Sequence, residues 1–128
     1  MKILVVDDVT PMRHLILHML RGLGLNDLHE ASDGILALKM LRKEKYDFVI
    51  TDWYMPKLSG LDLVIRIRED EKLKELPILM MSGENELDKI KKVASAGVSS
   101  FITKPFSAKG LQKKIEFIFK KPATSQKS

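Results

Sequence analysis

The sequence predicts an open, doubly wound parallel sheet with helices on both faces. Five short apolar runs alternate with five segments whose apolar residues recur at helical spacing, and together they occupy about 120 of the 128 residues. Most of the short runs are rich in β-branched or large apolar residues, which is typical of strands buried on both faces. Five alternating β and α elements in a chain of this length indicate the α/β class.

The predicted strands and helices follow one another in strict alternation. The strands are Lys2–Val6, Leu28–Ala31, Phe48–Thr51, Ile78–Met81 and Phe101–Thr103. The helices are identified by apolar stripes, which are Met12, Leu15, Ile16, Met19, Leu20 and Leu23; Ile35, Leu38 and Leu41; Leu61, Val64 and Ile67; Leu87, Ile90 and Val93; and Leu111, Ile115, Ile118 and Phe119. Helix N-caps are expected at Thr10, which precedes a proline at the first helical position, and at Ser59 and Ser107. Gly24 and Gly97 are expected to end helices.

Length and composition predict one soluble domain, residues 1–121, followed by a disordered basic tail, residues 122–128. With 128 residues, no second, output domain is expected. The absence of cysteine excludes a disulfide framework and thiolate chemistry and favours a cytoplasmic location. No apolar stretch reaches the roughly 18 residues that a membrane span needs, so no membrane insertion is expected.

Charge is distributed unevenly along the chain. Residues 1–88 carry a net charge of −4, whereas residues 89–128 carry +9. The basic end can attract nucleic acid, an acidic membrane surface or an acidic protein partner, or it can be a solvated lysine face. Charge alone does not choose among these, but no nucleic-acid recognition motif is present, so no nucleic-acid partner is predicted.

Reactive side chains follow four of the five predicted strands. Asp7 and Asp8 follow the first strand, Asp52 the third, Ser82 the fourth and Lys104 the fifth. In open α/β sheets, ligands bind outside the carboxyl ends of the strands, so these groups are expected to converge on one crevice. Each has an ordinary explanation by itself, such as a helix cap, a turn or a solvated lysine. All five falling at strand ends by chance is far less probable than a shared site.

Converging carboxylates repel one another unless protons or a cation intervene. Oxygen ligands without histidine or cysteine suit Mg²⁺, which binds one or two carboxylates and bridges to phosphate. Lys104 is placed to pair with a phosphoryl oxygen, and the Ser82 hydroxyl can donate to another. No phosphate-binding glycine loop is present, so Asp52 is predicted to be the nucleophile that becomes an aspartyl phosphate.

These residues lie in blocks that resemble the response-regulator receiver domain, in the same order, over residues 1 to about 120. The blocks are Val5-Val6-Asp7-Asp8, Ile50-Thr51-Asp52-Trp53-Tyr54-Met55-Pro56, Met81-Ser82-Gly83-Glu84 and Ile102-Thr103-Lys104-Pro105-Phe106. The Asp-Trp-x-Met-Pro form and the expected lack of an output domain are most similar to the single-domain regulators of chemotaxis. The resemblance implies a flavodoxin-like fold with five helices and the strand order 2-1-3-4-5.

The resemblance also implies roles for the residues at the strand ends. Asp52 is implied to accept a phosphoryl group from a sensor histidine kinase of the chemotaxis type. Asp8, Asp52 and the backbone carbonyl of Tyr54 are implied ligands of Mg²⁺, with Asp7 holding a metal-bound water. Lys104 pairs with the phosphoryl group, and Ser82 forms a switch with Phe101, which stands where chemotaxis regulators usually have tyrosine.

A partner surface is expected on the basic last third of the chain. Six residues are assigned to it alongside the switch residue Ser82, namely Lys91, Lys92, Phe101, Lys113, Lys114 and Phe117. A basic surface with aromatic anchors suits an acidic amphipathic segment, such as one from a flagellar motor switch component. A phosphatase is a further possible partner, and the protein is expected to be a monomer.

The leading hypothesis is a response regulator that switches its affinity for an effector, and which is not a turnover enzyme. One alternative is a phosphorelay intermediate or phosphate sink without its own effector. Another is a haloacid-dehalogenase-type phosphatase, but that family expects a second aspartate where this chain has Tyr54. His14 and His18 lie off the apolar stripe of their helix and are expected to be exposed rather than to bind a metal.

Overall fold

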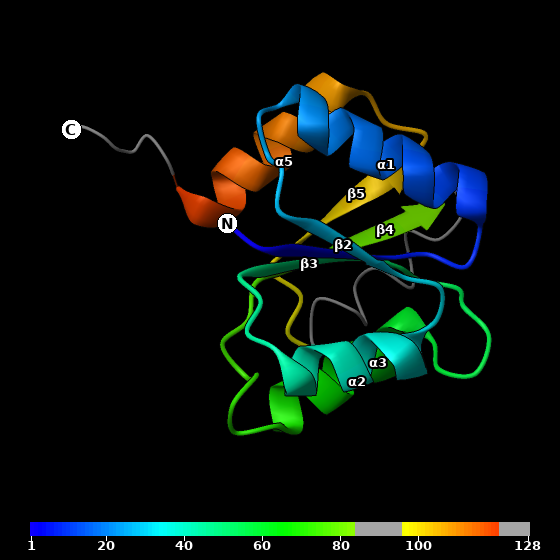
Figure 1. Cartoon of the computed structure of the whole chain (residues 1–128), viewed down its shortest axis with the longest axis vertical. Helices are drawn as coiled ribbons and strands as arrows, with labels where there is room; N and C mark the ends of the chain where they lie inside the picture. Colours follow the sequence, from blue (N-terminus) through cyan, green and yellow to red (C-terminus); the bar gives the residue numbers. More distant parts are fainter. Residues whose placement is uncertain (84–95, 121–128) are drawn as a thin grey trace.

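A five-stranded parallel sheet lies at the centre of the fold, with the strand order β2-β1-β3-β4-β5 (Figure 1). The computed structural model describes residues 1–83 and 96–120. Its strands are β1 Ile3–Val6, β2 Leu28–Ala31, β3 Phe48–Asp52, β4 Ile78–Gly83 and β5 Ser100–Lys104. All four strand pairs are parallel, which confirms the predicted fold class and strand order.

The described helices cover the sheet on both faces, as Figure 1 shows. They are α1 Thr10–Gly22, α2 Gly34–Lys43, α3 Gly60–Glu69 and α5 Ala108–Phe119. Helices α1 and α5 lie on one face, and α2 and α3 lie on the other. The predicted helix with Leu87, Ile90 and Val93 and the predicted tail, residues 122–128, fall outside the described residues.

Two hydrophobic clusters lie on opposite faces of the sheet because successive strand residues point to opposite faces. In β1, Ile3 and Val5 belong to the cluster beneath α1 and α5, whereas Leu4 and Val6 belong to the cluster beneath α2 and α3. All four side chains are fully buried. The near-continuous apolar strands of the sequence are therefore explained by burial from both sides.

Side-chain caps begin most of the described helices. Ser59 accepts a hydrogen bond from the backbone N–H of Asp62, and Ser107 accepts one from Gly110, as predicted. The prediction for Thr10 was wrong by one residue, because Thr10 is already helical and Val9 is the N-cap. The helix starts early because the Asp7 side chain accepts from the Val9 N–H and turns the chain there.

Gly24 ends α1 as predicted, and its conformation explains why. Its φ of 86° lies in the left-handed region, where glycine has no steric penalty. The N–H of Gly24 bonds to the carbonyl of Arg21, and the N–H of Leu25 bonds to that of Leu20. This pair of bonds satisfies carbonyls at the end of the helix.

Three burial predictions were wrong, and packing explains each. Leu15 is exposed, and Leu17 is buried instead, because α1 also packs against α5 and turns its buried face that way. Ile35 is exposed in the first turn of α2, before the helix makes its contacts through Ala37, Leu38 and Leu41. Strand β2 is not buried on both faces because it forms an edge of the sheet.

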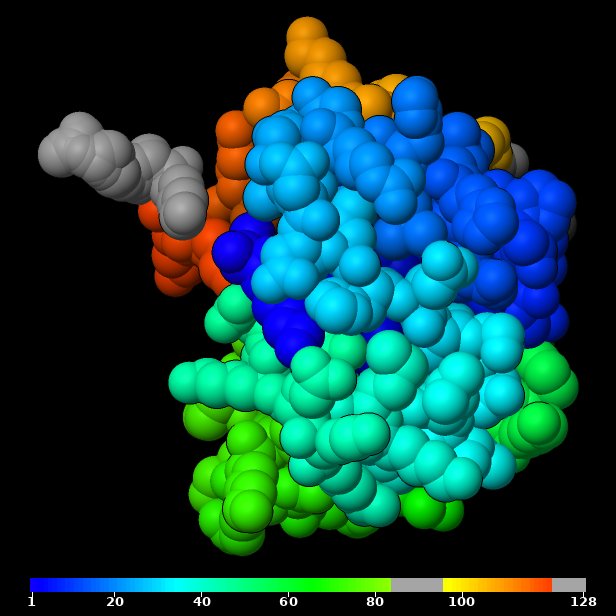
Figure 2. All heavy atoms as spheres, viewed as in Figure 1, coloured from blue at the N-terminus to red at the C-terminus, as the bar shows by residue number. Residues whose placement is uncertain are grey.

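The space-filling view shows α1 in blue and α2 in cyan over much of one side of the molecule (Figure 2). None of the helices in residues 1–83 and 96–120 is long and apolar enough to cross a membrane.

Candidate functional site

Three carboxylates meet at the carboxyl ends of the two central strands. Asp7 and Asp8 follow β1, and Asp52 is the last residue of β3, which pairs with β1. One carboxylate oxygen from each residue lies within 4.8 Å of the others. The topology produces this convergence, because parallel neighbours end at the same edge of a sheet. The three carboxylates thus lie together, and their assignment to one functional site stays a prediction.

Asp7 is the most buried of the three. Its side chain is fully buried, its Oδ1 accepts a hydrogen bond of 2.9 Å from the Val9 N–H, and its Oδ2 has no partner among the described residues. Burial raises the pKa of Asp7 above its ordinary value, and the Val9 hydrogen bond only partly opposes this. The neighbouring charge of Asp52 raises the pKa further. A buried carboxylate oxygen without a partner is costly unless a cation or donor satisfies it.

Asp52 is the second buried carboxylate, and it has a cationic partner. Its Oδ1 is 2.8 Å from the Nζ of Lys104, which reaches it from the end of β5. Burial nevertheless raises the pKa of Asp52, although the Lys104 hydrogen bond and charge lower it. Lys104 therefore lies beside the predicted nucleophile, where it can also meet a phosphoryl oxygen.

Ser82 lies in β4, one residue beyond Met81, which is the cross-strand neighbour of Asp52. Its side chain is almost fully buried, and its Oγ has no hydrogen-bond partner among the described residues. A buried hydroxyl without a partner is uncommon in folded proteins. It is available to donate to a new acceptor that enters the site.

The loop from Trp53 to Ser59 is held close to Asp52 by a glycine. The N–H of Gly60 bonds to the Trp53 carbonyl at 2.8 Å, and a Cβ on Gly60 would lie 2.1 Å from the Asp52 carbonyl oxygen. Trp53 packs into the cluster beneath α2 and α3. Tyr54 follows it and is exposed.

Comparison with known proteins identifies the family to which the chain belongs. Residues 3–116 match the response regulator receiver domain. The chain is 49% identical over 121 residues to the chemotaxis protein CheY-3 of Vibrio cholerae serotype O1, covering 94% of this chain and 93% of that protein. The chain belongs to the response regulator receiver domain family. It is a CheY-like receiver, so the hypothesis of a haloacid-dehalogenase-type phosphatase is set aside.

Solved receiver structures share the fold. The chemotaxis response regulator CheY4 of Vibrio cholerae superposes with a TM-score of 0.84 at 31% identity, covering 91% of this chain and 97% of that chain. The receiver domain of the sensor histidine kinase PA1611 from Pseudomonas aeruginosa PAO1 gives 0.82 at 29% identity, covering 92% and 97%. The latter structure has a magnesium ion coordinated in its active site cleft.

The carboxylates of this receiver fit a divalent cation chemically. The site offers hard oxygen donors, and the unpartnered Oδ2 of Asp7 lies in it. The raised pKa values of Asp7 and Asp52 have burial as their first cause, and a cation would favour the ionised form of both. A groove of about 950 Å³ lies at the opposite edge of the sheet, among residues 41–47 and 70–77, and contains none of these side chains.

The predicted partner surface is described only in part, because Lys91 and Lys92 fall outside the described residues. Phe101 lies in β5 and is half-buried, with the Nζ of Lys114 5.7 Å from the centre of its ring. Lys113 is exposed on α5, and Phe117 on the same helix is 65% exposed. Phe117 is the most exposed of the large hydrophobic side chains among the described residues.

Sequence reasoning missed two residues that shape the site. Gly60 lies against the Asp52 carbonyl, and Arg13 bonds to the Asp7 carbonyl at 2.7 Å. Neither follows a strand, so the rule that located the carboxylates could not find them. Asp33, which caps α2 through the Leu36 N–H, was also missed, although aspartate before an apolar stripe is a recognisable signal.

Proposed function

We propose that this receiver accepts a phosphoryl group on Asp52 from a sensor histidine kinase and then changes its affinity for an effector protein. The observation that carries the proposal is the position of Asp52, which is buried at the end of β3 beside Lys104 and within 4.8 Å of Asp7 and Asp8. The similarity to CheY-3 supports a role in chemotaxis. The lack of cysteine supports a cytoplasmic location.

The transfer is a substitution at phosphorus. A carboxylate oxygen of Asp52 forms the new bond to phosphorus while the bond from phosphorus to the kinase histidine nitrogen breaks, and the nitrogen keeps the electron pair. Lys104 is 2.8 Å from the same carboxylate, so it can move from the carboxylate to a phosphoryl oxygen with little displacement. Electrostatic stabilisation of this kind is a large part of phosphoryl transfer catalysis.

Mg²⁺ is the cofactor that we propose for the carboxylate cluster. Asp8, Asp52 and the backbone carbonyl of Tyr54 would hold the ion, and Asp7 would hold one of its waters through the Oδ2 that has no partner among the described residues. When bound, the ion neutralises charge that develops on the phosphoryl oxygens. Lys104 is not a proposed ligand of the ion, so a Lys104→Ala variant should still bind Mg²⁺.

Ser82 and Phe101 are proposed to transmit the change. The buried Ser82 hydroxyl lacks a partner among the described residues and can donate to a phosphoryl oxygen. Phe101 lies in β5, three residues before Lys104, and its ring packs against the cluster beneath α2 and α3 with the Lys114 Nζ 5.7 Å from its centre. Movement of Ser82 toward the phosphate would give Phe101 room to turn inward.

The effector is proposed to dock on the surface that carries Phe101, Lys113, Lys114 and Phe117, with an acidic amphipathic segment such as one of a flagellar motor switch component. Lys91 and Lys92 belong to the same proposed surface from the chain segment before β5.

A fluorescent acidic amphipathic peptide should bind the phosphorylated protein more tightly than the unphosphorylated one. Phe101→Ala and Lys113→Glu should weaken this binding, whereas the control Lys39→Glu on α2 should not. NMR chemical-shift changes that are confined to α1 and α2 when the peptide is added would place the interface elsewhere.

The decisive experiment is incubation with acetyl phosphate and Mg²⁺ followed by intact mass analysis. The wild type should gain one phosphoryl group, and Asp52→Asn should gain none. Ser82→Ala should accept the group but lose the phosphorylation-dependent gain in peptide affinity. Equal phosphorylation of the wild type and Asp52→Asn would exclude Asp52 as the acceptor.

A further inference from the structure

Arg13 connects three elements around the acidic site. Its Nη1 donates to the backbone carbonyl of Asp7 at 2.7 Å, and its Nε donates to Oε1 of Glu30 at 2.6 Å. Arg13 lies in α1, Asp7 follows β1, and Glu30 lies in β2. The Arg13 side chain is 11% exposed and Glu30 is 43% exposed, so the bond to the Asp7 carbonyl is the more shielded of the two. Charge-assisted bonds in a fixed fork geometry restrict orientation as well as position.

The Asp7 carbonyl belongs to the peptide unit that joins Asp7 to Asp8. Because a peptide unit is planar, a bond that fixes its carbonyl oxygen also fixes the direction in which the chain continues to Asp8. The other contacts of Asp7 lie on the preceding side of that unit or on its side chain, namely its N–H to the Ala31 carbonyl and its Oδ1 to the Val9 N–H. Arg13 therefore holds the peptide between the two carboxylates.

Glu30 holds Arg13 in this orientation. The hydrogen bond from Arg13 is the main reason that the pKa of Glu30 is lowered, so Glu30 is ionised at neutral pH. The Arg13–Glu30 pair then contributes no net charge to the neighbouring acidic site. His14 Nε2 lies 3.5 Å from the same Glu30 oxygen, on the exposed side of the pair.

We infer that Arg13 is a positioning residue for the acidic site: by holding the Asp7–Asp8 peptide it sets where both carboxylates stand relative to Asp52. Glu30 supports it by fixing the guanidinium. The inference rests on the proposed function and assigns the residue no contact with the ion or the phosphoryl group.

The first test measures Mg²⁺ affinity with the metal alone, by calorimetry and by emission of Trp53, which follows Asp52. Arg13→Met keeps the length of the side chain and removes its donors, and it should weaken Mg²⁺ binding about tenfold, as loss of an outer-shell partner does. Arg13→Lys should lie between this variant and the wild type. Arg21→Met is the matched control, because it removes the same charge from the same helix without touching Asp7.

The second test separates positioning from a merely structural role. A structural role predicts a lower melting temperature for Arg13→Met with unchanged Mg²⁺ affinity and unchanged acetyl phosphate reactivity. Positioning predicts that both properties fall in folded protein, and that Glu30→Gln, which keeps an acceptor for Arg13, shows a smaller loss. Arg13→Lys supplies the comparison if Arg13→Met does not fold.

Affinity and reactivity within about twofold of the wild type in the folded variants would overturn the inference, since an outer-shell role predicts a larger loss. Failure of the wild type to take up a phosphoryl group would instead reject the proposed function. The ratio of Mg²⁺ dissociation constants still tests Arg13 in that case, because it is measured without a phosphodonor.

Discussion

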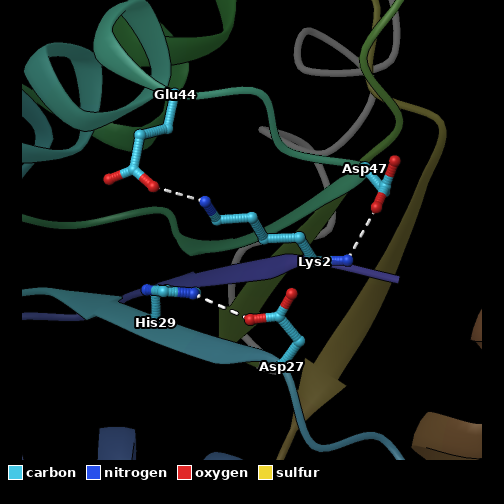
Figure 3. A network of polar contacts seen from close by, with 5 residues as sticks. All are labelled: Lys2, Asp27, His29, Glu44 and Asp47. Atoms are coloured by element: carbon cyan, nitrogen blue, oxygen red, sulfur yellow. Dashed lines mark hydrogen bonds and ion pairs between the residues drawn. The ribbon is translucent and has the colours of Figure 1, made fainter.

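At the amino ends of the strands charged groups lie in pairs, whereas at the carboxyl ends they crowd together. Figure 3 shows the amino edge, where the Lys2 side chain contacts Glu44, the Lys2 N–H donates to Asp47 at 2.7 Å, and His29 lies 3.0 Å from Asp27. At the carboxyl edge Asp7, Asp8 and Asp52 lie together, and Lys104 is the one cation among the described residues that forms an ion pair with their carboxylates. Charged groups at the amino ends of the strands are thus paired, whereas the carboxylates at the carboxyl ends of the same sheet outnumber their cationic partners.

The pKa shifts of Glu44 at the amino edge and of Asp7 and Asp52 at the carboxyl edge have opposite signs. The Lys2 hydrogen bond lowers the pKa of Glu44, so ionisation of Glu44 stabilises the fold. Burial raises the pKa of Asp7 and Asp52, so their ionisation destabilises it. The comparison teaches that the carboxyl edge holds unfavourable charge that a ligand can relieve, and perturbed carboxylates of this kind are typical of functional sites.

Mg²⁺ should produce the largest change, and only at the carboxyl edge. At a concentration about a hundred times its dissociation constant, the ion should stabilise the wild type by about 2.7 kcal/mol, because it binds the folded state alone. Thermal unfolding with and without Mg²⁺ measures the effect. Asp8→Asn should show a much smaller increase in melting temperature, and an equal increase in this variant would remove Asp8 from the site.

Asp7→Asn should stabilise the metal-free protein at pH 7 by roughly 1 kcal/mol, since it removes a buried charge that repels its neighbours. The amide keeps an oxygen that can accept from the Val9 N–H. Asp47→Asn is the control from the amino edge, where the carboxylate accepts from the Lys2 N–H, and it should not stabilise. Denaturant unfolding of the two variants tests the contrast, and a destabilised Asp7→Asn would contradict it.

Acidification should change the contributions of the two edges to stability in opposite directions. The folded-state pKa values of Asp7 and Asp52 lie above their ordinary value of 3.8, so the folded protein holds protons that the unfolded chain has released, and stability falls as pH rises through them. The pKa of Glu44 lies below its ordinary value of 4.5, so its contribution is lost only as pH falls below that value. As pH falls from neutral toward the ordinary carboxyl pKa values, the melting temperature of metal-free protein should therefore rise before the loss at Glu44 begins below 4.5. A profile that falls throughout this window would show that burial does not dominate at Asp7 and Asp52.

Glu44→Gln should have the smallest effect. It removes the ion pair with Lys2 at the surface, where side chains keep much of their hydration and salt screens their attraction. The melting temperature should change little at low salt and less at high salt. A loss as large as the gain in Asp7→Asn would show that the amino edge contributes more to stability than surface pairs generally do.

Much of the fold could be predicted because burial imposes local patterns. The runs around Val5, Ile50 and Leu79 are apolar on both faces, and the helices between them repeat at helical spacing. The pattern fails where apolar residues are consecutive, as in Leu15-Ile16-Leu17. There the neighbouring α5, not the spacing, decides that Leu17 is buried and Leu15 is not.

The candidate site was predictable to the extent that it follows the ends of strands. Asp7, Asp52 and Lys104 could be located from that rule, and the described structure brings them together. Arg13 could not, because its contacts with Asp7 and Glu30 join segments that the sequence separates by 6 and 17 residues. Such contacts depend on how helix and sheet pack, which no local pattern records.

Gly60 restricts how this sequence can drift over evolutionary time. Any other residue there would place a Cβ 2.1 Å from the Asp52 carbonyl oxygen and 3.1 Å from the Met80 sulfur. At Gly22, by contrast, an added Cβ meets nothing within 4 Å. A substitution at position 60 must shift either its own backbone or that of the proposed phosphoacceptor, so selection for folding and selection for chemistry act there on the same contact.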